Sequence, residues 1–123
     1  LLHERIRKEF WGYAPHENLT HEELLKVKYQ GIRPALGYPA CPEHSEKENL
    51  FHLLEAEKTG MSLTEHFAMY PNASVSGQYF AHPDSRYFSL EKAGRDQITD
   101  YAKRTGKPVE YIEKFLPTNL NYK

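Results

Sequence analysis

Cysteine is almost missing from this chain of 123 residues, because Cys41 is its single example. One cysteine excludes an internal disulfide and favours a reducing, cytoplasmic location. Long apolar runs are missing as well, and none comes near the ~20 residues that a membrane-spanning helix needs. We therefore expect neither a disulfide framework nor a membrane partner.

A strong excess of charge of one sign is also missing. The sequence has 16 lysines and arginines against 17 aspartates and glutamates, and its formal net charge is -1. Such a balance gives no basic field that would attract nucleic acid, so we expect no nucleic-acid partner. Hydrophobic residues make up 39% of the chain and aromatic residues 13%, which excludes a disordered tail. We predict one folded unit over residues 1–123 that finds its partners through local sites.

The opening segment "LLHERIRKEFW" has the spacing of an amphipathic helix. Leu2, Ile6 and Phe10 fall on one face of it. No capping residue precedes this pattern. We therefore expect that the chain starts inside an element and forms the C-terminal part of something larger.

Two capping boxes predict the next helices. Thr20 with Glu23 predicts a short helix to about Lys28, and Ser45 with Glu48 predicts a longer one that ends near residue 60. The apolar stripe of this longer helix consists of Leu50, Phe51, Leu53 and Leu54.

Between residues 63 and 90 the pattern changes to short aromatic and β-branched segments separated by proline turns. "LTEHFAMYP", "SVSGQYFAHP" and "SRYFSLE" predict two or three antiparallel strands, the last two joined through "AHPDS" as a hairpin. Two further helices follow, one closed by Gly106 and one opened by Pro108, and "PTNLNYK" is interpreted as a tail. Ile98, Tyr101 and Ala102 mark the first of these helices, and Val109, Ile112 and Leu116 share one face of the second. The fold class is α+β, with helices packed on a small antiparallel sheet.

The usual signatures of self-contained catalysis or metal binding do not occur. The seven histidines show no H-E-x-x-H spacing, and Cys41 with His44 is a lone pair of ligand types without a second pair. No Ser-His-Asp order, G-x-S-x-G elbow or phosphate-binding glycine loop is present. We therefore expect neither a metal site nor a catalytic residue in this chain.

The segment "GIRPALGYP" at residues 31–39 is the first candidate site. Arg33 precedes a proline that holds it extended, and Gly37 permits a close approach before Tyr38. A stiff loop of this kind loses little entropy when it binds a ligand. Arg33 could pair with a carboxylate or phosphate, and the carbonyls of Pro34 and Ala35 could accept hydrogen bonds from an amino-purine. The alternative is a surface loop whose arginine caps the C-terminus of a helix.

The segment "SRYFSL" is the second candidate. In a strand, Tyr87 and Phe88 would point to opposite faces, Phe88 with Leu90 toward the core and Tyr87 with Ser89 toward solvent or a ligand. The alternative is an ordinary pair of aromatic residues on a half-buried sheet.

The run "YQGIRPALGYPACPEHSEK", with its R-x-x-x-G-Y core, resembles the S-adenosylmethionine-binding motif in the C-terminal activation domain of cobalamin-dependent methionine synthase. "RIRKEFWGYAPHENL", "TGMSLTEHFAMYPNASVSGQYF", "HPDSRYFSLEKAGRDQITDYAKR" and "LPTNLNY" resemble the same family in the same order. The resemblance implies that residues 1–123 are the C-terminal portion of that domain, with a bent antiparallel sheet and helices.

The resemblance also implies a function in repair. Such a domain docks on the cobalamin-binding domain of the same enzyme and supports reductive methylation of cob(II)alamin with S-adenosylmethionine and a flavodoxin-like electron donor. The parent enzyme, with zinc and cobalamin in its other domains, transfers a methyl group from 5-methyltetrahydrofolate to homocysteine. Two other hypotheses stay open: a protein-interaction module without a small ligand, and a stand-alone methyltransferase, which the lack of a glycine-rich strand-to-helix turn disfavours.

The family's binding residues can be placed on this sequence one at a time. Arg33 is expected to bind the ligand's carboxylate, and His44 matches a histidine near the docked corrin. Val27 stands where relatives often carry an acidic residue, which leaves a cobalamin contact there unsupported. The family's acidic contacts to the ligand lie before Leu1, so we expect weaker binding by this chain than by a complete domain. The residues expected to contact S-adenosylmethionine are Arg33, Pro34, Ala35, Gly37, Tyr38, Tyr87 and Phe88.

Overall fold

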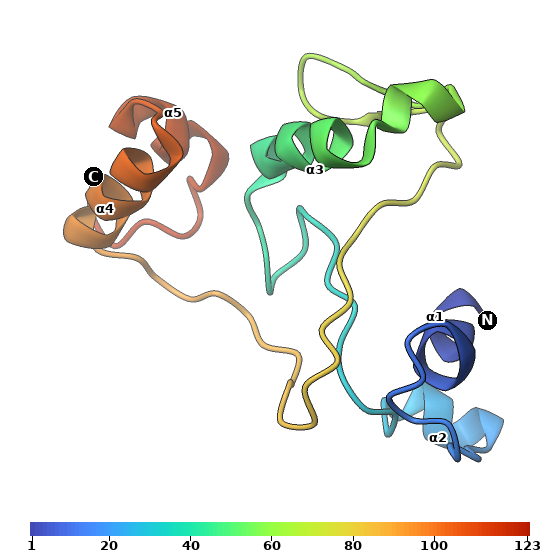
Figure 1. The fold of residues 1–123 in the computed structure, drawn as a ribbon. Helices are drawn as coiled ribbons and strands as arrows, with labels where there is room; N and C mark the ends of the chain where they lie inside the picture. Colours follow the sequence, from blue (N-terminus) through green and yellow to red (C-terminus); the bar gives the residue numbers. More distant parts are fainter. The chain divides into compact units, whose positions relative to one another are not determined.

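The computed structural model describes residues 1–123, and these divide into two compact units. The first unit consists of residues 1–34 and 77–87, and the second of residues 35–76 and 88–123. Figure 1 traces the chain through them from the blue N-terminus to the red C-terminus. That residues 1–123 act together as a single domain stays a prediction.

The first unit begins with a helix, as predicted. α1 spans Leu2–Arg5 and continues as a single π-helical stretch, η1, over Ile6–Phe10. The apolar face of the predicted helix is largely open, because Leu2 is 60% and Phe10 61% exposed, while Ile6 is half-buried. His3 and Arg7, one turn apart, are the buried side chains instead.

The short helix α2 spans His21–Leu25, and its capping box is present. The Thr20 hydroxyl accepts from the Glu23 N–H at 3.3 Å, and the Glu23 carboxylate accepts from the Thr20 N–H at 3.0 Å. The helix ends earlier than predicted, since Val27 has a left-handed backbone with φ of 56°. Local capping chemistry therefore located the start of this helix better than its end.

Polar side chains form much of the interior of the first unit, where Ile32 is also buried. The Arg7 guanidinium is 2% exposed, makes two hydrogen bonds of 2.6 and 2.5 Å with Glu17, and lies 4.5 Å from the centre of the Tyr29 ring. The His3 ring packs 4.9 Å from Tyr29 and 5.0 Å from Tyr79. Because each charge has a partner in the unit, burial of Arg7 and Glu17 is offset by their mutual hydrogen bonds.

In the second unit the predicted capping box at Ser45 is wrong. α3 spans Lys47–Leu54 and follows a 3₁₀ turn, η2, over His44–Glu46. Ser45 is fully buried, its N–H donates to the Glu43 carboxylate at 2.7 Å, and its hydroxyl accepts from the Lys107 ammonium at 3.0 Å. A partner distant in the sequence therefore uses the hydroxyl that was expected to cap the helix.

The apolar stripe of α3 is less buried than its pattern indicates. Phe51 is buried, whereas Leu53 and Leu54 are exposed. α3 ends at Glu55, which has a left-handed backbone, and the 3₁₀ helix η3 continues over Ala56–Thr59 to Gly60. The helical segment thus stops at the predicted residue, but in two pieces.

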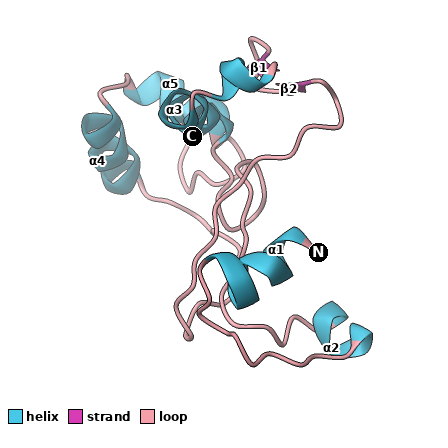
Figure 2. Cartoon of the chain, turned by 45° about the vertical axis from the view of Figure 1, so that its right-hand side comes forward, coloured by secondary structure: helices cyan, strands magenta, loops and turns pink.

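The α+β class is confirmed, with a smaller sheet than the prediction. β1, Ser62–Leu63, pairs antiparallel with β2, Met69–Tyr70 (Figure 2). The strands expected in residues 74–91, and the hairpin between them, do not form. Phe80 instead forms an isolated antiparallel bridge with Ile32. Residues 78–80 therefore pair with the Pro/Gly loop and have no pairing with residues 85–91.

The last two helices agree with the prediction. α4 spans Arg95–Thr105 and ends at a left-handed Gly106, and α5 spans Val109–Phe115 after Pro108. Ile112 is 0% exposed and lies at the centre of this core. The buried cluster consists of Ala93, Ile98, Ala102, Ile112 and Leu116.

The final residues are more than the expected tail. Leu120 forms a parallel bridge with Ala93, and the Ala93 N–H donates to the Asn119 carbonyl at 2.6 Å. The Asn119 side-chain amide also donates to the Leu90 and Glu91 carbonyls at 2.7 and 3.0 Å. These bonds hold the C-terminal segment against the α4–α5 core. None of the helices has both the length and the apolar character needed to cross a bilayer.

Candidate functional site

The loop before Arg33 is fixed by backbone hydrogen bonds to residues 78–80. Ile32 and Phe80 exchange two bonds of 3.0 and 2.9 Å, and the Pro34 carbonyl accepts from the Gln78 N–H at 3.1 Å. Gly31 has a φ of +81°, and a Cβ there would lie 2.1 Å from the Phe80 carbonyl oxygen. Only glycine fits this approach, so the loop holds one shape even though proline donates no hydrogen bond.

Arg33 and Tyr87 come together in the first unit. The Arg33 N–H donates to the Tyr87 hydroxyl at 2.9 Å, and the Tyr29 hydroxyl lies 3.4 Å from the same oxygen. Burial is the largest cause that raises the pKa of Tyr87, and the hydrogen bond with Tyr29 is the next. The Arg33 side chain is exposed and makes neither a hydrogen bond nor an ion pair, so it caps no helix. Its guanidinium is free to bind an anion.

The positive charge of Arg33 acts on the buried His3. Burial comes first among the causes that lower the pKa of His3 to about 4, and the charges of Arg7 and Arg33 come next. The Nδ1 atom of His3 is buried without a hydrogen-bond partner. His3 is thus a buried, neutral imidazole on which the charge of Arg33 acts.

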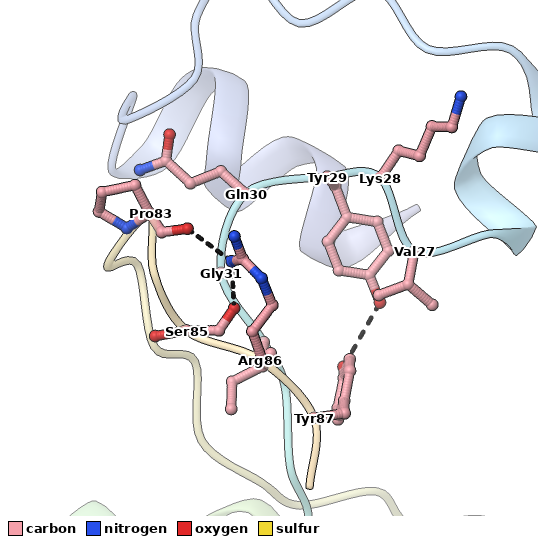
Figure 3. Close-up of a pocket in the computed structure, with 10 residues that line it drawn as sticks. Val27, Lys28, Tyr29, Gln30, Gly31, Pro83, Ser85, Arg86 and Tyr87 are labelled. Atoms are coloured by element: carbon pink, nitrogen blue, oxygen red, sulfur yellow. Dashed lines mark hydrogen bonds between the residues drawn. The ribbon is translucent and has the colours of Figure 1, made fainter.

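A cleft of about 530 Å³ lies in the first unit, and Tyr87 is one of the residues that line it (Figure 3). Its walls are residues 27–32 and residues 83 and 85–87. The Arg86 guanidinium donates to the carbonyls of Pro83 and Ser85 at 2.7 and 2.9 Å, which holds it on the cleft wall. Lys28 supplies a second cation, 3.6 Å from Glu23. Anionic or polar ligand groups fit such a wall better than apolar ones.

Sequence reasoning missed most of this cleft. Lys28 lies close to the first candidate motif in the sequence, and Arg86 lies within the second. This proximity could have indicated a shared cationic surface, but the two motifs were interpreted separately. Val27, expected to mark a departure from an acidic family position, lines the cleft with an exposed side chain. The valine therefore places an apolar group where a carboxylate would add negative charge.

The rest of the R-x-x-x-G-Y motif belongs to the second unit. The Cys41 N–H donates to the Tyr38 carbonyl at 2.8 Å, and the Gly37 N–H donates to the Cys41 carbonyl at 2.8 Å, which closes a tight turn. Gly37 has a φ of +95°, and a Cβ there would lie 2.1 Å from Cε1 of His44. The close approach expected at Gly37 is thus to a side chain of the chain itself, and Tyr38 stays exposed.

His44 is hydrogen-bonded through one ring nitrogen. Its Nδ1 lies 2.9 Å from the Lys47 ammonium nitrogen, which also donates to the Phe67 carbonyl at 3.0 Å. Burial and the charge of Lys47 lower the pKa of His44, while the Glu43 carboxylate opposes them. The imidazole therefore stays neutral under conditions where a free histidine is partly protonated.

The strand-based expectation for Phe88 is wrong. Residues 85–91 are not a strand, and Phe88 and Leu90, predicted to face the core, are both exposed. Arg33, Pro34 and Tyr87 belong to the first unit. The other predicted site residues belong to the second unit, namely Ala35, Gly37, Tyr38, His44 and Phe88.

A partly buried network in the second unit was also missed. The Tyr101 hydroxyl donates to the carboxylates of Glu46 and Glu43 at 2.9 and 3.4 Å. Burial and these carboxylates raise the pKa of Tyr101 far above its ordinary value. No local pattern signals this network, because Tyr101 is more than 50 residues from both glutamates. Cys41 is a free thiol, and no three His, Cys, Asp or Glu side chains gather as a metal site would require.

Comparison with known proteins gives two consistent findings. Residues 1–106 match the family described as the activation domain of vitamin B12 dependent methionine synthase. A crystal structure described as the MetH reactivation domain bound to AdoHcy is 59% identical, with a TM-score of 0.92. The match covers 99% of this chain and 38% of that one, so the present chain spans well under half of that relative. Because the family match extends over most of its length, the chain belongs to the family of methionine synthase activation domains.

Proposed function

We propose that this chain is the S-adenosylmethionine-binding reactivation portion of a cobalamin-dependent methionine synthase. Family membership and the likeness to a reactivation domain bound to AdoHcy support this function. The observation that carries it is the exposed, unpaired Arg33 guanidinium on a loop that the Tyr87 hydroxyl holds through the Arg33 N–H.

Arg33 would bind the carboxylate of the ligand's methionine part. Since the guanidinium has no partner in the chain, binding breaks no existing ion pair. A well-formed hydrogen bond to a charged group contributes roughly 1.5–3 kcal/mol. Fixed backbone at Gly31 and Ile32 means that little conformational entropy is lost when the pair forms.

The remaining site residues are proposed to contact the same ligand class. Pro34 and Ala35 would offer adenine the second lone pairs of their carbonyls, because these carbonyls already accept from the N–H groups of Gln78 and Tyr38. Tyr87 would line the ligand beside Arg33. In the second unit, Gly37 and Tyr38 complete the motif. Phe88 is proposed as an exposed aromatic contact, which agrees with its open side chain.

The chain's own contribution is binding and orientation. S-adenosylmethionine supplies an activated methyl group, and the cobalamin of a neighbouring domain supplies the methyl acceptor. Positioning of the two is the main requirement for such a transfer, which agrees with the lack of a recognisable acid–base pair in this chain.

The remaining partners and the setting are part of the proposal. We infer docking on the cobalamin-binding domain of the same enzyme, with His44 close to the corrin, and reduction by a flavodoxin-like donor in the cytoplasm. The complete enzyme would then transfer methyl groups from 5-methyltetrahydrofolate to homocysteine, with zinc and cobalamin held in its other domains.

The test is Arg33→Ala in the complete enzyme, titrated calorimetrically with S-adenosylhomocysteine, which has no methyl group to transfer. A loss of roughly 1.5–3 kcal/mol corresponds to a 10- to 150-fold rise in Kd. Arg104→Ala is the matched control, because Arg104 is an exposed arginine paired with Asp100. An unchanged Kd in Arg33→Ala would contradict the assignment.

A further inference from the structure

We propose that Lys47 is a positioning residue that fixes the ring tautomer of His44, so that Nε2 is presented as a hydrogen-bond donor to an oxygen acceptor on the docked cobalamin-binding domain. The inference deepens the proposed function and depends on it for the identity of the partner. The tautomer itself is a property of this chain alone.

The geometry at Lys47 determines which ring nitrogen carries the proton. The Lys47 side chain is 6% exposed, and its ammonium contacts Nδ1 of His44 at 2.9 Å and the Phe67 carbonyl at 3.0 Å. An ammonium group only donates hydrogen bonds. Nδ1 must therefore offer its lone pair, which places the proton of the neutral ring on Nε2.

Gly37 packs against the ring of His44 at Cε1, the carbon between the two nitrogens. A Cβ at Gly37 would lie 2.6 Å from each ring nitrogen of His44, so the imidazole lies directly against the glycine backbone. The ring is thus bonded at Nδ1 and packed against a surface where any larger residue would displace it. His44 is nevertheless an exposed residue, and Nε2 makes no hydrogen bond within the chain.

Charge strengthens the same arrangement. Protonation of Nδ1 would break its bond with Lys47 and place two cations 2.9 Å apart. Lys47 and Glu43 are the charged groups that act on the ring, and they oppose each other. Burial and Lys47 outweigh Glu43, so the ring stays neutral and Nε2 donates.

This tautomer decides what His44 offers to a docked partner. With its proton on Nε2 the ring donates to an oxygen atom, and it supplies no lone pair from that nitrogen to a proton or to cobalt. The hydrogen bond at Nδ1 also orients the ring, as outer hydrogen-bond partners commonly do for functional histidines.

The first experiment measures the tautomer by long-range ¹H–¹⁵N correlation of the histidine rings in the full chain, with His44→Gln to assign the signals. We expect a single form of His44 with Nδ1 unprotonated. In Lys47→Met we expect a mixture of both tautomers and a higher pKa of His44, while Lys47→Arg restores the single form. If Lys47→Met fails to fold, Lys47→Gln is the substitute, because its amide carries no charge and can either donate to Nδ1 or accept from it. It should give both tautomers and raise the pKa. A single, unchanged tautomer and an unchanged titration of His44 in either variant would overturn the proposal.

The second experiment concerns docking. In the complete enzyme, His44→Phe should slow reactivation several-fold, and His44→Gln, whose amide still donates, should slow it less. Lys47→Met should resemble His44→Phe. Equal rates in all three variants and the wild type would refute the docking role. The Kd for S-adenosylhomocysteine in Arg33→Ala is measured in a separate experiment. Failure of the proposed function and failure of this inference can therefore be distinguished.

Discussion

The buried His3 makes the stability of the first unit depend on pH. Burial and the cations Arg7 and Arg33 lower the pKa of His3 to about 4, whereas an unfolded histidine titrates near 6.5. Between about pH 4 and pH 6.5, His3 therefore binds a proton in the unfolded chain but not in the folded chain. The free energy of unfolding falls as the pH falls through this window, and His3 contributes no further loss below pH 4.

The size of this effect follows from the two pKa values. A fall from 6.5 to about 4 corresponds to a loss of ~3 kcal/mol once the pH is below both values, or ~2.5 kcal/mol at pH 4.5. This is an upper limit, because local opening around a protonated ring would reduce the cost. A loss of that size is a large fraction of the stability of a small domain.

The assay is urea unfolding followed by fluorescence. Trp11 is the single tryptophan and belongs to the first unit, so its emission reports on the unit that contains His3. His3→Phe is the control variant, because it fills a similar space among the tyrosines and cannot bind a proton. Between pH 7 and 4.5 the wild type should lose ~2.5 kcal/mol more than the variant. Parallel pH profiles for the two proteins would show that the reasoning about His3 is wrong.

Two further substitutions test the supports of the two units. Gly31→Ala should destabilise the first unit by about 1–3 kcal/mol or more, because its φ is +81° and its new Cβ would meet the Phe80 carbonyl; Trp11 fluorescence in urea measures the loss. A stability equal to wild type would mean that the loop takes another shape. Ile112→Ala should lower the stability of the second unit by roughly 2–5 kcal/mol in thermal unfolding by circular dichroism, against roughly 0.5 kcal/mol or less for the exposed Leu53→Ala. Similar losses in both variants would contradict the assigned core.

The sequence predicted those elements that depend on neighbouring residues. Thr20 caps its helix through Glu23, and Gly106 and Pro108 separate α4 from α5, because these interactions lie within a few residues. The strands were predicted poorly, since Phe80 pairs with Ile32 and its own neighbours give no sign of that partner. Tertiary pairing decided the outcome where local propensity was ambiguous.

In the candidate site, too, the sequence predicted the local features and missed the contacts between distant residues. The stiffness around Arg33 follows from its prolines and glycines, and the exposed guanidinium agrees with a binding role. Ser45 was misassigned because Lys107, its true partner, is distant in the sequence. The contact between Gly37 and His44 was likewise invisible, although a close approach at the glycine was expected.

Residues beyond the end of the family match contribute to the hydrophobic core of the second unit. The family match stops at residue 106, yet Ile112 and Leu116 from α5 complete the cluster around Ile98, and Leu120 packs beside them. A protein shortened at that boundary would leave the apolar side of α4 facing water. A protein expressed for binding studies should therefore extend through Leu120, because an exposed apolar face of this kind favours aggregation.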